Sequence, residues 1–120
     1  MQRKLHLFLL TTVLAAALAS VLPALGQAAP RRIEITAKKF EFTPAEITLK
    51  KGEPVVLVLK SADVSHGLRF RELGVTVNAG KGKTAEVAFT PDKTGTFIGH
   101  CSVFCGSGHG SMILTLHVME

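Results

Sequence analysis

The sequence contains no tryptophan and no tyrosine, and only two of its 120 residues are cysteines. Seven phenylalanines are its only aromatic side chains besides histidine, so it offers little on which nucleic acid bases could stack. A chain of this length forms one domain, which is too small for a deep substrate cleft. These absences favour a small binding or carrier module over an enzyme.

Acidic side chains are absent from the beginning of the chain. Two of the 14 Lys and Arg residues, and none of the nine Asp and Glu residues, lie in residues 1–26. The remaining 94 residues therefore carry 12 basic and nine acidic side chains, a net charge of +3. So mild a charge gives no argument for nucleic-acid binding, although the whole chain has a net charge of +5.

The first 26 residues have the pattern of a secretory signal peptide. Two basic residues precede an apolar run over residues 5–22, and Pro23 ends the run just before small residues of the kind that a signal peptidase reads. We expect cleavage after Gly26 or Ala28, and an uncleaved membrane anchor is the alternative. In both cases the domain that follows this segment is expected in the periplasm or another extracytoplasmic space. The expected division is an export segment at 1–26, a linker at 27–32 and a domain at 33–120.

From Ile33 onward, apolar and polar residues mostly alternate with the period of a β-strand. Residues 55–59 are apolar throughout, as in a strand that is buried on both faces. Glycine and proline turn signals separate the runs, and no window has a helical period. The pattern predicts an all-β sandwich or Greek-key barrel. The expected strands lie at 33–37, 47–49, 55–59, 68–70, 75–77, 85–89, 96–98 and 112–118.

Both cysteines lie in one window, which has the spacing C-x3-C-x3-H-x2-M: Cys101, Cys105, His109 and Met112. Three glycines, at 106, 108 and 110, allow tight bends in the loop. Two thiolates, an imidazole and a thioether form a soft ligand set, which suits copper better than calcium or magnesium. His66, at the start of an expected strand, is the candidate for a further ligand.

Each of these residues also has an ordinary structural interpretation. Two cysteines in an exported protein most often form a disulfide, but the register of His109 and Met112 with them favours a metal site. His100 and His117 are expected to be surface residues. The lysines at 38–39, 50–51, 81 and 83 flank turns and are expected to form a solvated rim, with a docking patch for an acidic partner as the alternative.

The chain resembles the copper-binding domain of cytochrome c oxidase subunit II, the CuA branch of the cupredoxins, over residues 33–118. Four segments carry the resemblance: 63–66, 72–75, 89–97 and 101–112. It implies a cupredoxin-like fold and a dinuclear copper site in which Cys101 and Cys105 bridge both ions. His66 and Met112 would then complete one copper, and His109 with the backbone carbonyl of Val103 would complete the other.

Two departures from subunit II shape the expected function. Val103 stands where subunit II usually has a glutamate that also contacts magnesium, so no magnesium is expected. The tryptophan through which electrons enter subunit II has no counterpart. We therefore expect a free-standing or singly anchored electron carrier, non-catalytic, whose partner is a c-type cytochrome or an oxidase. Val103, Phe104 and Ile113 are expected to shield the site from water.

Two other functions stay open. The same soft ligands bind Cu(I) well, so the chain could be a chaperone or storage protein that delivers copper to a respiratory oxidase. A small copper enzyme that acts on nitrogen oxides would need an open copper position, and the sequence shows none.

Overall fold

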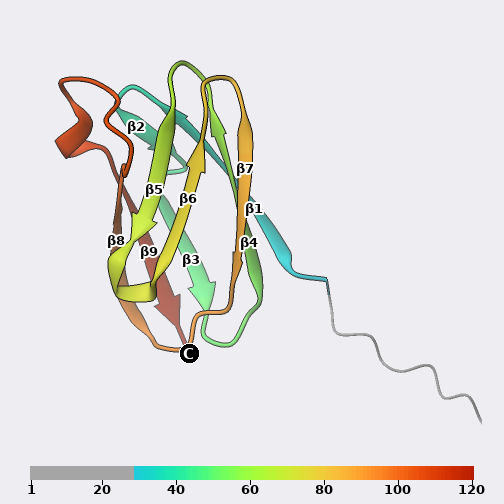
Figure 1. The fold of residues 1–120 in the computed structure, drawn as a ribbon. Helices are drawn as coiled ribbons and strands as arrows, with labels where there is room; N and C mark the ends of the chain where they lie inside the picture. Colours follow the sequence, from blue (N-terminus) through green and yellow to red (C-terminus); the bar gives the residue numbers. More distant parts are fainter. Residues whose placement is uncertain (1–28) are drawn as a thin grey trace, which may run out of the picture.

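The computed structural model describes residues 29–120, so the predicted export segment lies outside the described residues. Within this range nine strands form two sheets, with two short 3-10 turns and no α-helix (Figure 1). No helix of the described part is long and apolar enough to cross a membrane. The strands are β1 (Arg31–Lys38), β2 (Glu41–Thr43), β3 (Glu46–Lys50), β4 (Val55–Ser61), β5 (His66–Phe70), β6 (Val75–Ala79), β7 (Thr84–Phe89), β8 (Gly95–His100) and β9 (Ile113–Met119).

The predicted all-β sandwich is confirmed. One sheet has the order β2-β1-β4-β7 and the other has the order β3-β9-β8-β5-β6. All neighbouring strands are antiparallel except the parallel pairs β1–β4 and β3–β9. Each of the eight predicted runs forms a strand. The ninth strand, β2, was not predicted, because three residues next to Pro44 are too few to show an alternation.

The core lies between the two sheets and is formed by the alternate residues that the pattern indicates. Ile33, Ile35 and Ala37 face inward from β1, and Leu57 and Leu59 face inward from β4. Each large aliphatic side chain buried in this way contributes about 1.5–3 kcal/mol to stability. Val58 is also buried, on the other face of β4, which agrees with the uninterrupted apolar run there.

The topology brings three chain segments to one end of the sandwich. β8 pairs antiparallel with both β5 and β9, so the start of β5, the end of β8 and the start of β9 share that end. The loop 101–112 connects β8 to β9 and contains the turn η2 (His109–Ser111). Figure 1 shows this loop in orange to red, projecting from the sandwich beyond β8. His66, the first residue of β5, therefore lies beside both cysteines.

Candidate metal centre

Cys101 and Cys105 are both buried, and both are free thiols. Their Sγ atoms lie 3.7 Å apart, whereas the sulfurs of a disulfide are about 2.0 Å apart. The disulfide considered from the sequence is therefore not present. Two free sulfurs this close can, as thiolates, serve as ligands of the same metal ion. The spacing thus suits a pair of thiolates that share a metal.

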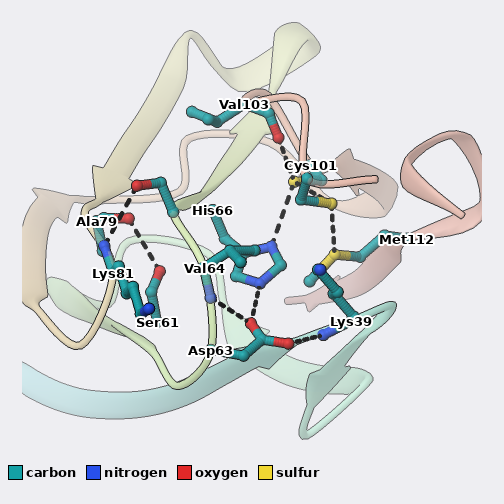
Figure 2. A network of polar contacts seen from close by, with 12 residues as sticks. Lys39, Ser61, Asp63, Val64, His66, Ala79, Lys81, Cys101, Val103 and Met112 are labelled. Carbon is teal, nitrogen blue, oxygen red and sulfur yellow. Dashed lines mark hydrogen bonds and ion pairs between the residues drawn. The ribbon is translucent and has the colours of Figure 1, made fainter. Parts of the chain in front are cut away.

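Four further donors surround the two sulfurs, and Figure 2 shows several of them. The Sγ of Cys101 lies 3.8 Å from Nδ1 of His66 and 3.2 Å from the carbonyl oxygen of Val103. The Sγ of Cys105 lies 3.7 Å from Nδ1 of His109 and 3.8 Å from Sδ of Met112. The fold thus brings together all six residues that the sequence indicated.

The donor set is soft, and four of its five donor side chains are buried. The ligand atoms of His66, Cys101 and Cys105 lie within 4.8 Å of one another, and all three residues are buried. Met112 adds a third sulfur and is fully buried as well. Sulfur with imidazole is the combination that copper prefers. These residues therefore fit copper. They do not suit a hard cation that prefers oxygen ligands, because the Val103 carbonyl is the one oxygen among these six donors.

Asp63 orients His66, a role that the sequence analysis did not assign to it. Its Oδ1 lies 2.7 Å from Nε2 of His66, so the ionised carboxylate accepts the Nε2–H and leaves Nδ1 free to face Cys101 (Figure 2). The backbone N–H groups of Lys39 and Val64 donate to the same carboxylate, at 2.9 Å and 2.7 Å. The Lys39 N–H, followed by the His66 and Val64 N–H groups, holds the pKa of Asp63 well below its usual range. Carboxylates that fix the far nitrogen of a ligating histidine are common around metal sites.

Burial raises the pKa of the Cys105 thiol to about 11, and its hydrogen bond with Cys101 adds to the effect. Cys105 is therefore protonated at neutral pH in the metal-free protein. Only the deprotonated sulfur is a good metal ligand, so a metal ion that binds Cys105 has to displace this proton.

The shape of loop 101–112 depends on two of its three glycines. Gly106 has a φ of +136°, which side chains rarely adopt, and a Cβ on Gly108 would overlap the ring of Phe40. A Cβ on Gly110 would meet no atom within 4 Å, so close packing does not require this glycine. Phe40, from the turn between β1 and β2, thus packs directly on the loop, which no sequence signal indicated.

A fourth glycine lets the loop pack against the sheet. Gly67 follows His66 directly, and a Cβ there would overlap the side chains of Ser102 and Asn78. The Ser102 hydroxyl donates to Asn78 at 2.9 Å, and the Ser102 N–H donates to the Gly67 carbonyl at 3.3 Å. This contact fixes Cys101 next to His66.

The expected apolar cover of the site is only partly present. Phe104 is 80% exposed and Ile113 is 43% exposed, so neither shields the sulfurs as expected, whereas Val103 is half-buried. Phe104 instead lies next to His109, with 5.6 Å between the ring centroids. His100 is exposed, as predicted, and His117 is half-buried with its Nε2 3.7 Å from a carboxylate oxygen of Glu46.

Comparison with known proteins relates this geometry to a family. The family model of the cupredoxin-like domain matches residues 7–114. The nitrous-oxide reductase of Cupriavidus necator is 34% identical over 84 residues, which are 67% of this chain and 13% of the reductase. Cytochrome c oxidase subunit 2 of Thermus thermophilus is 28% identical over 88 residues, which are 73% of this chain and 65% of the subunit. The match thus spans less than two thirds of the length of each relative.

A solved structure shows the same fold. The periplasmic domain of subunit II of cytochrome oxidase from Bradyrhizobium japonicum superposes with a TM-score of 0.70 and 24% identity, over 78% of this chain and 87% of that domain. The family match, this fold and the buried His/Cys/Cys group confirm the expected family and fold and support copper binding. The chain belongs to the cupredoxin-like domain family, as a copper-binding domain similar to the soluble part of cytochrome c oxidase subunit 2.

Proposed function

We propose that this domain holds two copper ions between the sulfurs of Cys101 and Cys105 and carries electrons. The separation of 3.7 Å between the two Sγ atoms carries the proposal. Both thiols are buried and free, and each sulfur faces the other sulfur and two further donor atoms. Packing alone does not require this convergence of donors, whereas a pair of bridging thiolates does.

The contacts around each sulfur support the assignment of ligands. His66 and Met112 would complete one copper, and His109 with the Val103 carbonyl would complete the other. Cys101 contacts His66 and the Val103 carbonyl, while Cys105 contacts His109 and Met112. Each sulfur therefore touches one donor of each proposed ion, which is the pattern that bridging requires.

Electron transfer fits this arrangement better than substrate turnover does. Copper held between the two thiolates would supply a redox centre whose charge is shared over both ions, so that its ligands need to move little on reduction. The chain contributes rigidity: Asp63 fixes the ring of His66, and Gly67 and Phe40 fix the loop that carries the other donors. His109 is half-buried while the other side-chain donors are buried, so we propose that electrons pass through its exposed edge.

We further propose that residues 1–26 direct export and that the domain, residues 33–120, works in the periplasm. The periplasmic location of the subunit II domain from Bradyrhizobium japonicum supports this, as does the signal-peptide pattern. β1 begins at Arg31, so the first two residues of the strand lie in the expected linker, 27–32. A c-type cytochrome or an oxidase is the proposed redox partner.

Copper delivery is the second candidate function, because three sulfurs around one site also bind Cu(I) well. Copper content under stress separates the two functions. The copper-loaded protein is cycled between oxidant and reductant in the presence of a Cu(I) chelator, and copper per chain is counted after each cycle. An electron carrier keeps two ions per chain throughout. Loss of copper to the chelator in the first reduction, or one ion per chain at the start, would favour delivery.

A further inference from the structure

A cleft of about 480 Å³ opens directly beside the candidate metal centre. Its lining comes from β5 and the turn that follows it, from the end of β8 and from loop 101–112. We call it the cationic cleft and define it by its lining residues, which are Arg69, Arg71, His100, Cys101, Ser102 and His109. One wall thus includes Cys101, whose sulfur contacts His66, the Val103 carbonyl and Cys105.

The two arginines of the cleft have no carboxylate partner among residues 29–120. Arg31 and Arg32 each form an ion pair, with Glu53 and Glu86 respectively, whereas Arg69 and Arg71 form none within the described range. Both are exposed, and a guanidinium stays charged at every physiological pH. The cleft therefore presents two fixed positive charges to any molecule that approaches the metal centre.

Exposed apolar side chains lie next to residues that line the same cleft: Ile113 pairs with His100 and Phe104 contacts His109. Ile98, Phe104 and Ile113 are 41%, 80% and 43% exposed, and they are three of the four large apolar side chains that residues 29–120 leave exposed. Strand register places Arg69 opposite His100, and His100 opposite Ile113, in one row across β5, β8 and β9. Aromatic side chains and arginine are both enriched in protein interfaces.

We propose that the cationic cleft and the exposed apolar side chains next to it form the docking surface for a redox protein with an acidic face. This inference rests on the proposed electron-carrier function and names the chemistry of its partner. Carboxylates of the partner would pair with Arg69 and Arg71, and its apolar surface would cover Phe104. A small anion would leave that ring exposed, and it would gain little from two hydrated arginines.

The position of the surface suits electron exchange. The ring of His109 lines the cleft, while its Nδ1 lies 3.7 Å from the Sγ of Cys105. A partner seated in the cleft therefore contacts a residue that itself contacts the centre. Complementary charge mainly accelerates encounter, so the effect is expected in the association rate and in its dependence on salt.

The test compares two charge-reversed proteins. The cleft variant carries R69E and R71E, and the control carries K50E and K93E, which make the same change in net charge at the opposite end of the sandwich. Lys50 ends β3 and Lys93 lies in the turn before β8, so neither is near loop 101–112. The milder pair R69Q and R71Q covers the case in which charge reversal impairs folding. Copper content and the thermal unfolding midpoint are checked for every variant.

Electron exchange of the copper-loaded proteins is then measured against an acidic and a basic c-type cytochrome of similar potential. At low ionic strength the cleft variant should exchange with the acidic cytochrome about tenfold or more slowly, and high salt should remove most of the difference. The control should change far less. Equal losses in both variants, or faster exchange of the unmodified protein with the basic cytochrome, would overturn the inference.

A second measurement separates docking from the proposed function. Amide chemical shifts of the Cu(I)-loaded protein are mapped on addition of the same acidic cytochrome with zinc in place of its haem iron, which cannot exchange electrons. Shifts around Arg69, Phe104 and Ile113 support the surface even if the centre proves not to carry electrons. Shifts confined to Lys81 and Lys83, or equal shifts with phosphate alone at matched ionic strength, would contradict it.

Discussion

Asp63 and His66 form a fixed pair: the carboxylate accepts the Nε2–H of the imidazole at 2.7 Å, and the ring consequently turns Nδ1 toward the sulfur of Cys101. The pair joins three parts of the chain, because the backbone of Lys39, in the turn between β1 and β2, holds Asp63 in place. A side chain that contacts none of the sulfurs thus sets the direction of a candidate metal donor.

The first prediction concerns this pair. The substitution D63N keeps the shape of Asp63 but removes the charge that fixes the tautomer of His66. Copper affinity should fall about 10–100-fold, as is usual when such a partner is lost. Competition with a chromogenic Cu(I) chelator measures it. D92N is the control, because Asp92 is exposed and lies far from the loop. Affinity that stays the same in D63N and D92N would show that Asp63 has no positioning role.

The second prediction concerns the glycines of loop 101–112. A Cβ added by G108A overlaps the Phe40 ring, whereas G110A places it in open space. Overpacking of this kind costs about 1–3 kcal/mol, so the thermal unfolding midpoint should fall clearly in G108A and barely move in G110A. Copper affinity should follow the same order. If both variants have the same thermal unfolding midpoint as the unmodified protein, Phe40 does not hold the loop.

The third prediction concerns the alkaline stability of the metal-free protein. The pKa of Cys105 is raised from 9.0 to about 11 in the folded state, so the unfolded chain loses this proton first as the pH rises. The free energy of unfolding should therefore fall between about pH 9 and about pH 11, by roughly 3 kcal/mol, and level off above. Urea denaturation under reducing conditions at several pH values measures it.

The chain has no tyrosine, so the window of that experiment contains only thiols and amines. C105S is the matched control, because it removes the thiol and keeps a small polar side chain. Its unfolding free energy should decline less over the same pH range. Parallel curves for the two proteins would rule out Cys105 as the source of the slope.

The fourth prediction concerns the path of the electron. His109 lines the cationic cleft, so H109Q should slow electron exchange with an acidic cytochrome more than H117Q does. His117 lies on β9 and contacts Glu46, away from the sulfurs. Stopped-flow rates, normalised to the copper content of each variant, provide the comparison. Equal rates in the two variants would remove His109 from the path.

The sequence predicts the sandwich well because a strand that is buried on one side alternates between apolar and polar residues. Ile33, Ile35 and Ala37 show this directly, and all three are core residues. The short strand β2 has only three residues and shows no such alternation. Met112 was expected to begin the last strand, but it caps η2 and is buried, and β9 begins one residue later.

The six candidate donors could also be named from the sequence, since five of them lie within one window of 12 residues and the sixth begins a strand. What holds them could not. The Lys39 backbone lies 24 residues from Asp63 in the sequence, and Phe40 lies more than 60 residues before the glycines on which it packs. Such contacts depend on how the loops meet in space, and the presence of a lysine or a phenylalanine in the sequence does not predict them. The cationic cleft could not be predicted either, because Arg69 and His100 become neighbours only when β5 pairs with β8.

The central claim is a dinuclear copper centre bridged by Cys101 and Cys105. The most direct measurement combines the copper content of the loaded protein with its electron paramagnetic resonance spectrum. We predict two copper ions per chain and a seven-line hyperfine pattern, which arises when one unpaired electron is shared equally by two copper nuclei. One copper per chain with a four-line pattern, or a disulfide between the two cysteines that blocks loading, would contradict the account.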